Sequence, residues 1–172
     1  PAVMIAAMAF AFTTPGKRPG VVPRAAEAAA LAALGVALLS GLTLIMGGAA
    51  SLTTLGLTLR LDAVSAIMLT LVSFVGWVVL RYAATYMDGE DRHGAFTGWL
   101  CATLAAVMLL VTAGELWLFV VAWVATSVFL QRLLLFYPGR VPARRAARKK
   151  WVTSRLGDLA LIAAAVLLQM GY

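Results

Sequence analysis

The sequence is poor in the residues that build disulfides and metal centres. Its 172 residues include one cysteine, Cys101, and one histidine, His93. These counts exclude a disulfide framework, a thiolate cluster and a local multi-histidine metal site on this chain. The sequence also lacks a phosphate-binding glycine loop, a Ser/His/Asp set and a haem-type histidine pair. It therefore predicts no cofactor and no metal on this chain.

Charged residues are scarce as well, whereas hydrophobic residues are abundant. Charged side chains make up 12% of the sequence and hydrophobic ones 63%, against about 25% and about 45–50% in soluble domains. The net charge of +7 could suit nucleic acid, but the basic residues lie between long apolar runs rather than on a polar surface. This composition is typical of a membrane protein and argues against nucleic-acid binding.

Six apolar stretches are long enough, or nearly so, to cross a bilayer as helices. We expect an all-α polytopic membrane protein with about six transmembrane helices in a single membrane domain over residues 1–172. Because the chain opens at Pro1 and stops at Tyr172 beside an apolar stretch, we expect it to be the amino-terminal part of a longer subunit. Asp62 is placed to cap the third helix, and Glu27 lies in the opening turn expected for the second. The predicted helices are residues 2–12, 25–46, 63–80, 95–113, 116–137 and 151–170.

Orientation follows from the distribution of basic residues, which collect on the cytoplasmic side of bacterial inner-membrane proteins. The second and fourth connections carry one basic residue, Arg60. The segments 13–24, 81–94 and 137–150 are therefore predicted to be cytoplasmic, and the amino terminus periplasmic. Their basic residues are Lys17, Arg18, Arg24, Arg81, Arg92, Arg140, Arg144, Arg145, Arg148, Lys149 and Lys150.

The segment Arg140–Lys150 is the longest clearly charged connection that we predict. Its simplest interpretation is an anchor that contacts anionic lipid headgroups. A docking surface for a cytoplasmic partner is the alternative.

Arg155 and Asp158 are the most informative charges, because charge within a transmembrane span is costly and points to function. Their spacing of i and i+3 places both on one helix face, close enough to pair. Asp158 follows Trp151 by seven residues, which is roughly 10 Å of helix, so it should face protein or a wet cavity. One interpretation is a relay or gate carboxylate whose proton affinity depends on its partner; the other is a structural ion pair that locks the sixth helix.

Three further residues are weaker candidates. Arg132 should reach the cytoplasmic interface by extending its long side chain. Glu115 should sit at the outer start of the fifth helix, where the helix dipole favours an acid and a channel-mouth role is an option. His93 is interpreted as a solvated histidine of a cytoplasmic loop, with a proton-loading site as the alternative.

Three segments resemble the large antiporter-like subunits of proton-pumping NADH-quinone oxidoreductase, namely chain 5 or subunit L, and of Na⁺/H⁺ antiporters. They are Leu59–Leu69, Tyr82–Glu90 and Lys149–Asp158. In proton-pumping members the fifth helix carries a Trp-Glu pair whose glutamate is the key membrane carboxylate. Here the matching pair is Trp123-Val124, so the resemblance does not carry over the usual carboxylate–lysine switch.

Other residues look closer to the DabB branch of this family, the membrane subunits of an inorganic carbon pump. They are Phe74–Val79, Arg81-Tyr82 and Gln131–Tyr137. This resemblance implies a cation-conducting subunit that couples to a soluble, zinc-containing DabA-like partner, with the zinc on the partner. Two alternatives remain open: a proton-translocating subunit L of a respiratory oxidoreductase, and a non-conducting membrane anchor for a cytoplasmic partner.

Overall fold

The computed structural model describes residues 1–13, 21–47, 50–54, 57–87, 92–136 and 141–171. Within these ranges the chain is almost entirely helical. A short antiparallel hairpin interrupts the helices between α2 and α3. The elements are α1 (Ala2–Thr13), α2 (Val21–Gly47), β1 (Ala50–Thr54), β2 (Leu57–Leu61), α3 (Ala63–Tyr86), α4 (His93–Val111), α5 (Leu116–Leu134) and α6 (Val141–Met170).

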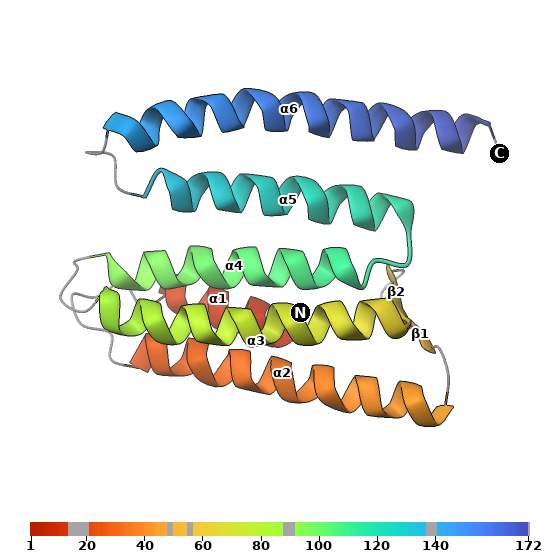
Figure 1. Ribbon diagram of the computed structural model, residues 1–172, viewed down its shortest axis with the longest axis horizontal. Helices are drawn as coiled ribbons and strands as arrows, with labels where there is room; N and C mark the ends of the chain where they lie inside the picture. The colour runs from red at the N-terminus through yellow and green to blue at the C-terminus, as the bar shows by residue number, and fades with distance from the viewer. Residues whose placement is uncertain (14–20, 48–49, 55–56, 88–91, 137–140, 172) are drawn as a thin grey trace.

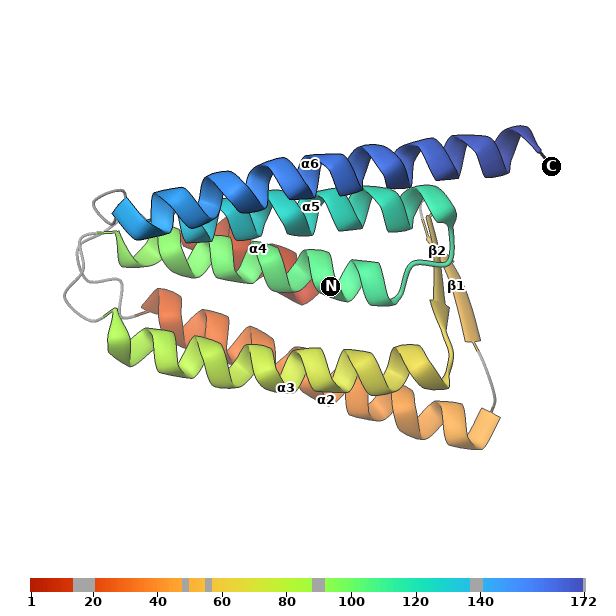
Figure 2. The ribbon, with the colours of Figure 1, turned by 45° about the horizontal axis from the view of Figure 1, so that its top comes forward.

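The helices run roughly side by side, and the hairpin sits at one end of the bundle (Figures 1 and 2). Helix α4 packs against α1, α3 and α5, whereas α6 packs against α5 at the edge. The core is built largely from alanines, together with Met4, Leu69, Leu80, Cys101 and Met108. Small side chains let membrane helices approach closely, which favours packing where lipid is as apolar as protein.

Five of the described helices are long and apolar enough to cross a membrane, and α1 is a shorter apolar helix. Large apolar side chains face outward along these helices, for example Leu39, Ile67 and Leu167, each exposed by 64–70%. An outward apolar surface of this kind suits lipid rather than water. The protein is therefore an all-α polytopic membrane protein, as its composition predicts.

The hairpin was not predicted, because the sequence interpretation considered only long apolar runs. Ala50 pairs with Leu61 and Thr54 with Leu57 in an antiparallel register. Strand β2 also joins the turn between α4 and α5, where the Arg60 amide donates to Thr112 O at 2.9 Å and the Gly114 amide donates to Thr58 O at 2.9 Å. A Cβ at Gly114 would lie 2.7 Å from Thr58 O, so this contact requires glycine.

Several predicted boundaries were wrong. Helix α2 begins at Val21, so Arg24 is helical and Glu27 lies beyond the opening turn; α3 continues to Tyr86, and α5 ends at Leu134. The largest correction concerns the segment 137–150. From Val141 onward it forms the start of α6, because its alanines, arginines and lysines favour helix over loop. Residues 14–20, 88–91 and 137–140, parts of the predicted cytoplasmic connections, lie outside the described residues.

Candidate functional site: a buried ion pair on the sixth helix

Helix α6 brings Arg155 and Asp158 together, as their spacing predicts. Arg155 Nη2 lies 3.3 Å from Asp158 Oδ2. The Asp158 side chain is 5% exposed and the Arg155 side chain 35% exposed. The carboxylate is therefore enclosed by protein, while the guanidinium reaches toward the surface.

Asp158 is buried because it lies on the face of α6 that meets α5. Among the residues whose side chains are described, Ala147 and Ala165 are also buried on this helix. Offsets of 11 and 18 residues from Ala147 return to nearly the same angle on an α-helix. Asp158 thus lies between two buried alanines on the contact face of α6.

Polar contacts join α6 to α5 at three levels. Gln131 Nε2 donates to Ala147 O at 3.2 Å. The hydroxyls of Ser127 and Ser154 are in direct hydrogen-bond contact. Trp117 Nε1 donates to Gln169 Oε1 at 2.7 Å near the other end. Hydrogen bonds between side chains contribute to helix association inside a membrane, and they set the register that covers Asp158.

The ion pair leaves acceptors and a donor unsatisfied. Both carboxylate oxygens of Asp158 and the Nε atom of Arg155 are covered, and none has a hydrogen-bond partner in the part of the chain that the structure describes. A buried carboxylate is stabilised when its remaining lone pairs are also filled. Among the described residues, the Arg155 guanidinium is therefore the main polar contact of this carboxylate.

A cavity of about 220 Å³ lies beside the amino-terminal half of α6. Lys150 and Ser154 line it from α6, eight and four residues before Asp158 and on the same side of the helix. Thr126 and Ser127 line it from α5. Leu110, Trp123 and Leu130 complete a mostly apolar lining, so three hydroxyls and one ammonium group are the polar groups of this cavity.

The position of the expected membrane carboxylate is apolar. Val124 lines a groove of about 470 Å³ together with Ala125, Val128 and Ile162. Neither a proton nor an ion pair can be held by this surface. The described part of α5 thus presents the Ser127 hydroxyl and the Gln131 amide to α6. At Val124, where the resemblance implies a glutamate, it has an apolar groove instead.

The weaker candidates lie apart from the ion pair. His93 is the first residue of α4 and is buried, at 6% exposure. The prediction of a solvated loop histidine is therefore wrong. Phe136, two residues after the end of α5, packs against the start of α4. Arg92 Nη2 donates to Phe136 O at 2.9 Å, and the Phe96 and Phe136 rings meet edge to face at 5.2 Å.

Arg132 and Glu115 lie at opposite ends of α5. Arg132 is exposed in the last turn, with its guanidinium carbon 5.9 Å from the Trp99 ring centroid. Glu115 is the exposed N-cap residue of α5, and its side chain makes no capping hydrogen bond. No role is established for either residue by these positions.

Sequence reasoning missed the polar seam between α5 and α6. The signal was present: Ser127 and Gln131 are spaced by four residues, which places them on one face of an otherwise apolar helix.

In the described residues, no three His, Cys, Asp or Glu side chains group as a metal site.

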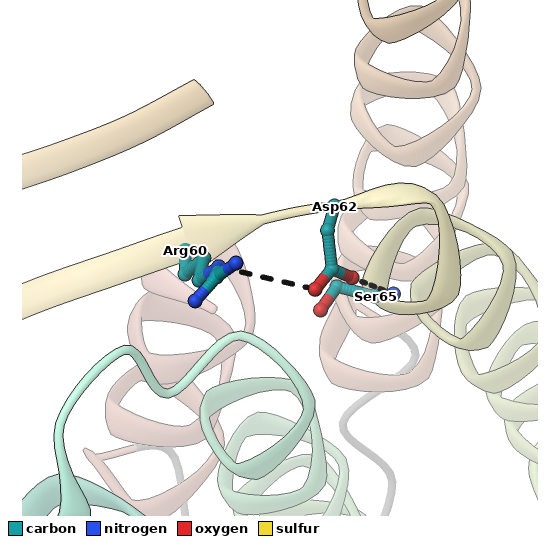
Figure 3. Close-up of polar contacts among 3 residues, drawn as sticks. All are labelled: Arg60, Asp62 and Ser65. Atoms are coloured by element: carbon teal, nitrogen blue, oxygen red, sulfur yellow. Dashed lines mark hydrogen bonds and ion pairs between the residues drawn. The ribbon is translucent and has the colours of Figure 1, made fainter. Parts of the chain in front are cut away.

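Asp62 caps α3 at the hairpin end of the bundle (Figure 3). Its Oδ1 accepts the Ser65 amide hydrogen at 2.8 Å, and Arg60 Nε lies 4.0 Å from its Oδ2. The backbone bond from Ser65, helped by the charge of Arg60, lowers the pKa of the Asp62 carboxyl below its ordinary value. The predicted cap is confirmed.

The packed apolar helices define a polytopic membrane protein, and the charged pair inside one of its spans is the candidate functional site. Residues 49–97 match the family described as NADH-ubiquinone oxidoreductase (complex I), chain 5 N-terminus. The chain is a homologue of DabB-type inorganic carbon transporter subunits and of NADH-quinone oxidoreductase chain 5 or subunit L.

Three relatives illustrate this kinship. The chain is 37% identical over 148 residues to the probable inorganic carbon transporter subunit DabB2 of Halothiobacillus neapolitanus, covering 80% of this chain and 27% of that protein. It is 34% identical over 119 residues to the probable DabB of Hydrogenovibrio crunogenus, covering 69% and 23%. It is 33% identical over 107 residues to NADH-quinone oxidoreductase subunit L of Escherichia coli, covering 62% and 18%. The chain spans about a quarter or less of the length of these relatives.

Proposed function

We propose that this chain is part of a cation-conducting, most simply proton-conducting, membrane subunit of an inorganic carbon uptake complex. Residues 1–172 would form one membrane domain in the bacterial inner membrane. The amino terminus would be periplasmic, and the amino-terminal ends of α2, α4 and α6 would face the cytoplasm. The Arg155–Asp158 pair carries this proposal.

The physical argument rests on the environment of the carboxylate. Asp158 is enclosed by protein, and both its oxygens lack hydrogen-bond donors in the described residues. A charge in hydrocarbon costs about 2.5–3.5 kcal/mol at a helix centre on insertion scales. Such a group lowers its free energy by binding a proton or a cation, and Arg155 can release it by moving toward the surface.

The proposal extends to partners. DabB proteins are named as subunits of an inorganic carbon transporter, which favours a soluble DabA-like partner for this chain. The zinc would lie on that partner. The basic residues of the segment Arg140–Lys150, of which the side chains of residues 140–146 lie outside the described part, would contact anionic lipid headgroups.

The test is Asp158→Asn in the full-length complex. We expect carbon uptake to be abolished while membrane insertion and complex assembly remain, because asparagine keeps the shape but cannot exchange a proton. Asp62→Asn is the matched control, since it makes the same substitution at a partly exposed carboxylate that caps α3; uptake should stay within about twofold. Normal uptake by Asp158→Asn would remove this residue from the mechanism.

A second candidate is a proton-translocating subunit of a respiratory oxidoreductase. The match of residues 49–97 to complex I chain 5 favours it. Deleting the gene should then abolish proton pumping driven by NADH oxidation, whereas the carbon-uptake proposal predicts intact respiration and a growth requirement for high CO₂. Neighbouring genes for a zinc protein or for quinone-reductase subunits provide a further discriminator.

A third candidate is a non-conducting membrane anchor, which the apolar surroundings of Val124 favour. Transport measurements on proteoliposomes that contain the complete complex distinguish a non-conducting anchor from a cation-conducting subunit. Uptake that is independent of any cation gradient would support the anchor and contradict conduction.

A further inference from the structure

A groove of about 500 Å³ runs along the last turns of α3. Trp77, Arg81 and Thr85 line one side, and Val78, Tyr82 and Tyr86 line the other. Each row repeats every four residues, so the two rows are adjacent stripes on the helix surface. The groove therefore extends for roughly 13 Å along the helix axis, from apolar residues to a polar rim.

Two other grooves of similar volume show what is particular about this one. The groove at Leu38, Gly41 and Ala66 measures about 440 Å³, and the groove at Val121, Val124 and Ile162 about 470 Å³. Both are lined by uncharged residues, so each can accept any acyl chain that the bilayer offers. The α3 groove adds a guanidinium and two phenol hydroxyls at one end.

The charged rim is held in place by its neighbours. The Arg81 guanidinium carbon lies 5.7 Å from the Trp77 ring centroid, and the Tyr82 and Tyr86 rings stack at 5.7 Å. Arg81 Nη1 contacts Glu27 Oε1 at 3.4 Å, yet the Arg81 side chain is 67% exposed. In the described part of the chain this contact engages a single nitrogen of the guanidinium. The other N–H donors of the planar Arg81 guanidinium match the geometry of a phosphate group.

A second arginine lies near this ion pair on α2. Arg24 is exposed one helical turn before Glu27, so on the described parts of α2 and α3 at this end two arginines, Arg24 and Arg81, accompany Glu27. Tyrosine and tryptophan prefer the level of the lipid headgroups. An acyl chain against Trp77 and Val78 would leave the headgroup phosphate beside Arg81, Tyr82 and Tyr86.

We propose that the groove along Trp77–Tyr86 is a binding site for one anionic phospholipid. The acyl chain occupies the apolar part, and the phosphate accepts hydrogen bonds from the Arg81 guanidinium and the tyrosine hydroxyls. Glu27 competes with the phosphate for Arg81. The site is distinct from the ion pair on α6 and does not depend on the transported ion.

The test is lipid retention by the full-length protein, measured by native mass spectrometry after equilibration with equimolar phosphatidylglycerol and phosphatidylcholine of identical chains. The wild type should retain phosphatidylglycerol in preference. Arg81→Gln should lower that preference about tenfold, since it removes a charge-assisted hydrogen bond. Arg81→Lys should lower it as well, because it keeps the charge but loses the fork.

Two further variants separate binding from folding. Glu27→Gln breaks the same ion pair as Arg81→Gln but should raise the preference, since it removes the competing acceptor. Arg60→Gln is the matched control: Arg60 has a similar side-chain exposure of 69% and also faces a carboxylate, at the other end of the bundle. Equal retention of the two lipids by the wild type would overturn the proposal. So would an equal loss of preference in Arg60→Gln and Arg81→Gln, or a loss in Glu27→Gln.

Discussion

Two Arg–Asp pairs in the described part of the chain use the same residue types in opposite surroundings. At the hairpin, the side chains of Arg60 and Asp62 are 69% and 41% exposed and lie 4.0 Å apart. On α6, the side chains of Arg155 and Asp158 are 35% and 5% exposed and lie 3.3 Å apart. Asp62 accepts a backbone hydrogen bond from Ser65, whereas the oxygens of Asp158 have no such donor in the described residues.

This difference separates a structural carboxylate from a functional candidate. The charge of Asp62 is shared among water, a helix terminus and a loose cation, so its loss affects local stability. The charge of Asp158 depends mainly on Arg155, because burial removes water and the packed face supplies no amide. A group in that situation responds strongly to whatever cation approaches it.

The largest effect should come from breaking the buried pair. Arg155→Met leaves Asp158 enclosed without its cation and should lower the free energy of unfolding of the full-length protein by about 3–5 kcal/mol. Unfolding by denaturing detergent in mixed micelles measures this value. The double variant Arg155→Met/Asp158→Leu should recover most of the loss, since no charge remains buried. A double variant as unstable as the single one would contradict the argument.

A smaller effect is expected at the exposed pair, where Asp62→Ala removes the cap of α3. The midpoint of thermal unfolding should fall by a few degrees. Because the folded pKa of Asp62 lies below its unfolded value of about 3.9, its contribution is present at neutral pH and disappears as pH falls through the folded pKa. Asp62→Asn should keep the cap at pH 7 and flatten the decline in acid. An unchanged acid decline in both variants would exclude Asp62 as its source.

The Glu27–Arg81 pair, with side chains 27% and 67% exposed, is intermediate between the other two. A double-mutant cycle with Glu27→Gln and Arg81→Gln should give a coupling of about 0.3–0.5 kcal/mol in the free energy of unfolding. High salt should reduce it, because water screens this contact. A coupling of several kcal/mol would mean that the pair is far less accessible than its exposure indicates.

The smallest effect should follow from Arg60→Gln. Arg60 is mostly exposed and only approaches Asp62, so the midpoint of thermal unfolding should change by about 1 °C or less. A change as large as that of Asp62→Ala would show that the arginine, rather than the Ser65 amide, holds the carboxylate in place.

The sequence predicted the helical membrane class and most spans, because hydrocarbon requires long apolar helices whatever their neighbours are. It also predicted the Asp62 cap and the proximity of Arg155 and Asp158, since both follow from local helix geometry. It missed the hairpin, although Leu57, Leu59 and Leu61 alternate with Thr58 and Arg60 in the pattern of a strand. Membrane spans are recognised as runs of roughly 20 apolar residues, so strands of 5 residues are not detected in this way.

The wrong prediction for His93 has a different cause. His93 is buried at the start of α4, where the Phe96 and Phe136 rings also meet although they are 40 positions apart in the chain. Arg132 lies over Trp99, which belongs to the preceding helix. Neither neighbour can be inferred from spacing along one helix, because both depend on how α4 and α5 pack.

The sequence by itself determined that the chain spans a membrane, since apolar length and the placement of charge are properties of each segment alone. It also determined that Arg155 and Asp158 share one helix face. Only the tertiary structure decided that this face turns toward α5, that Ser127 meets Ser154 beside it and that Asp158 loses contact with water. Burial is a property of two packed surfaces, and one helical pattern specifies only one of them.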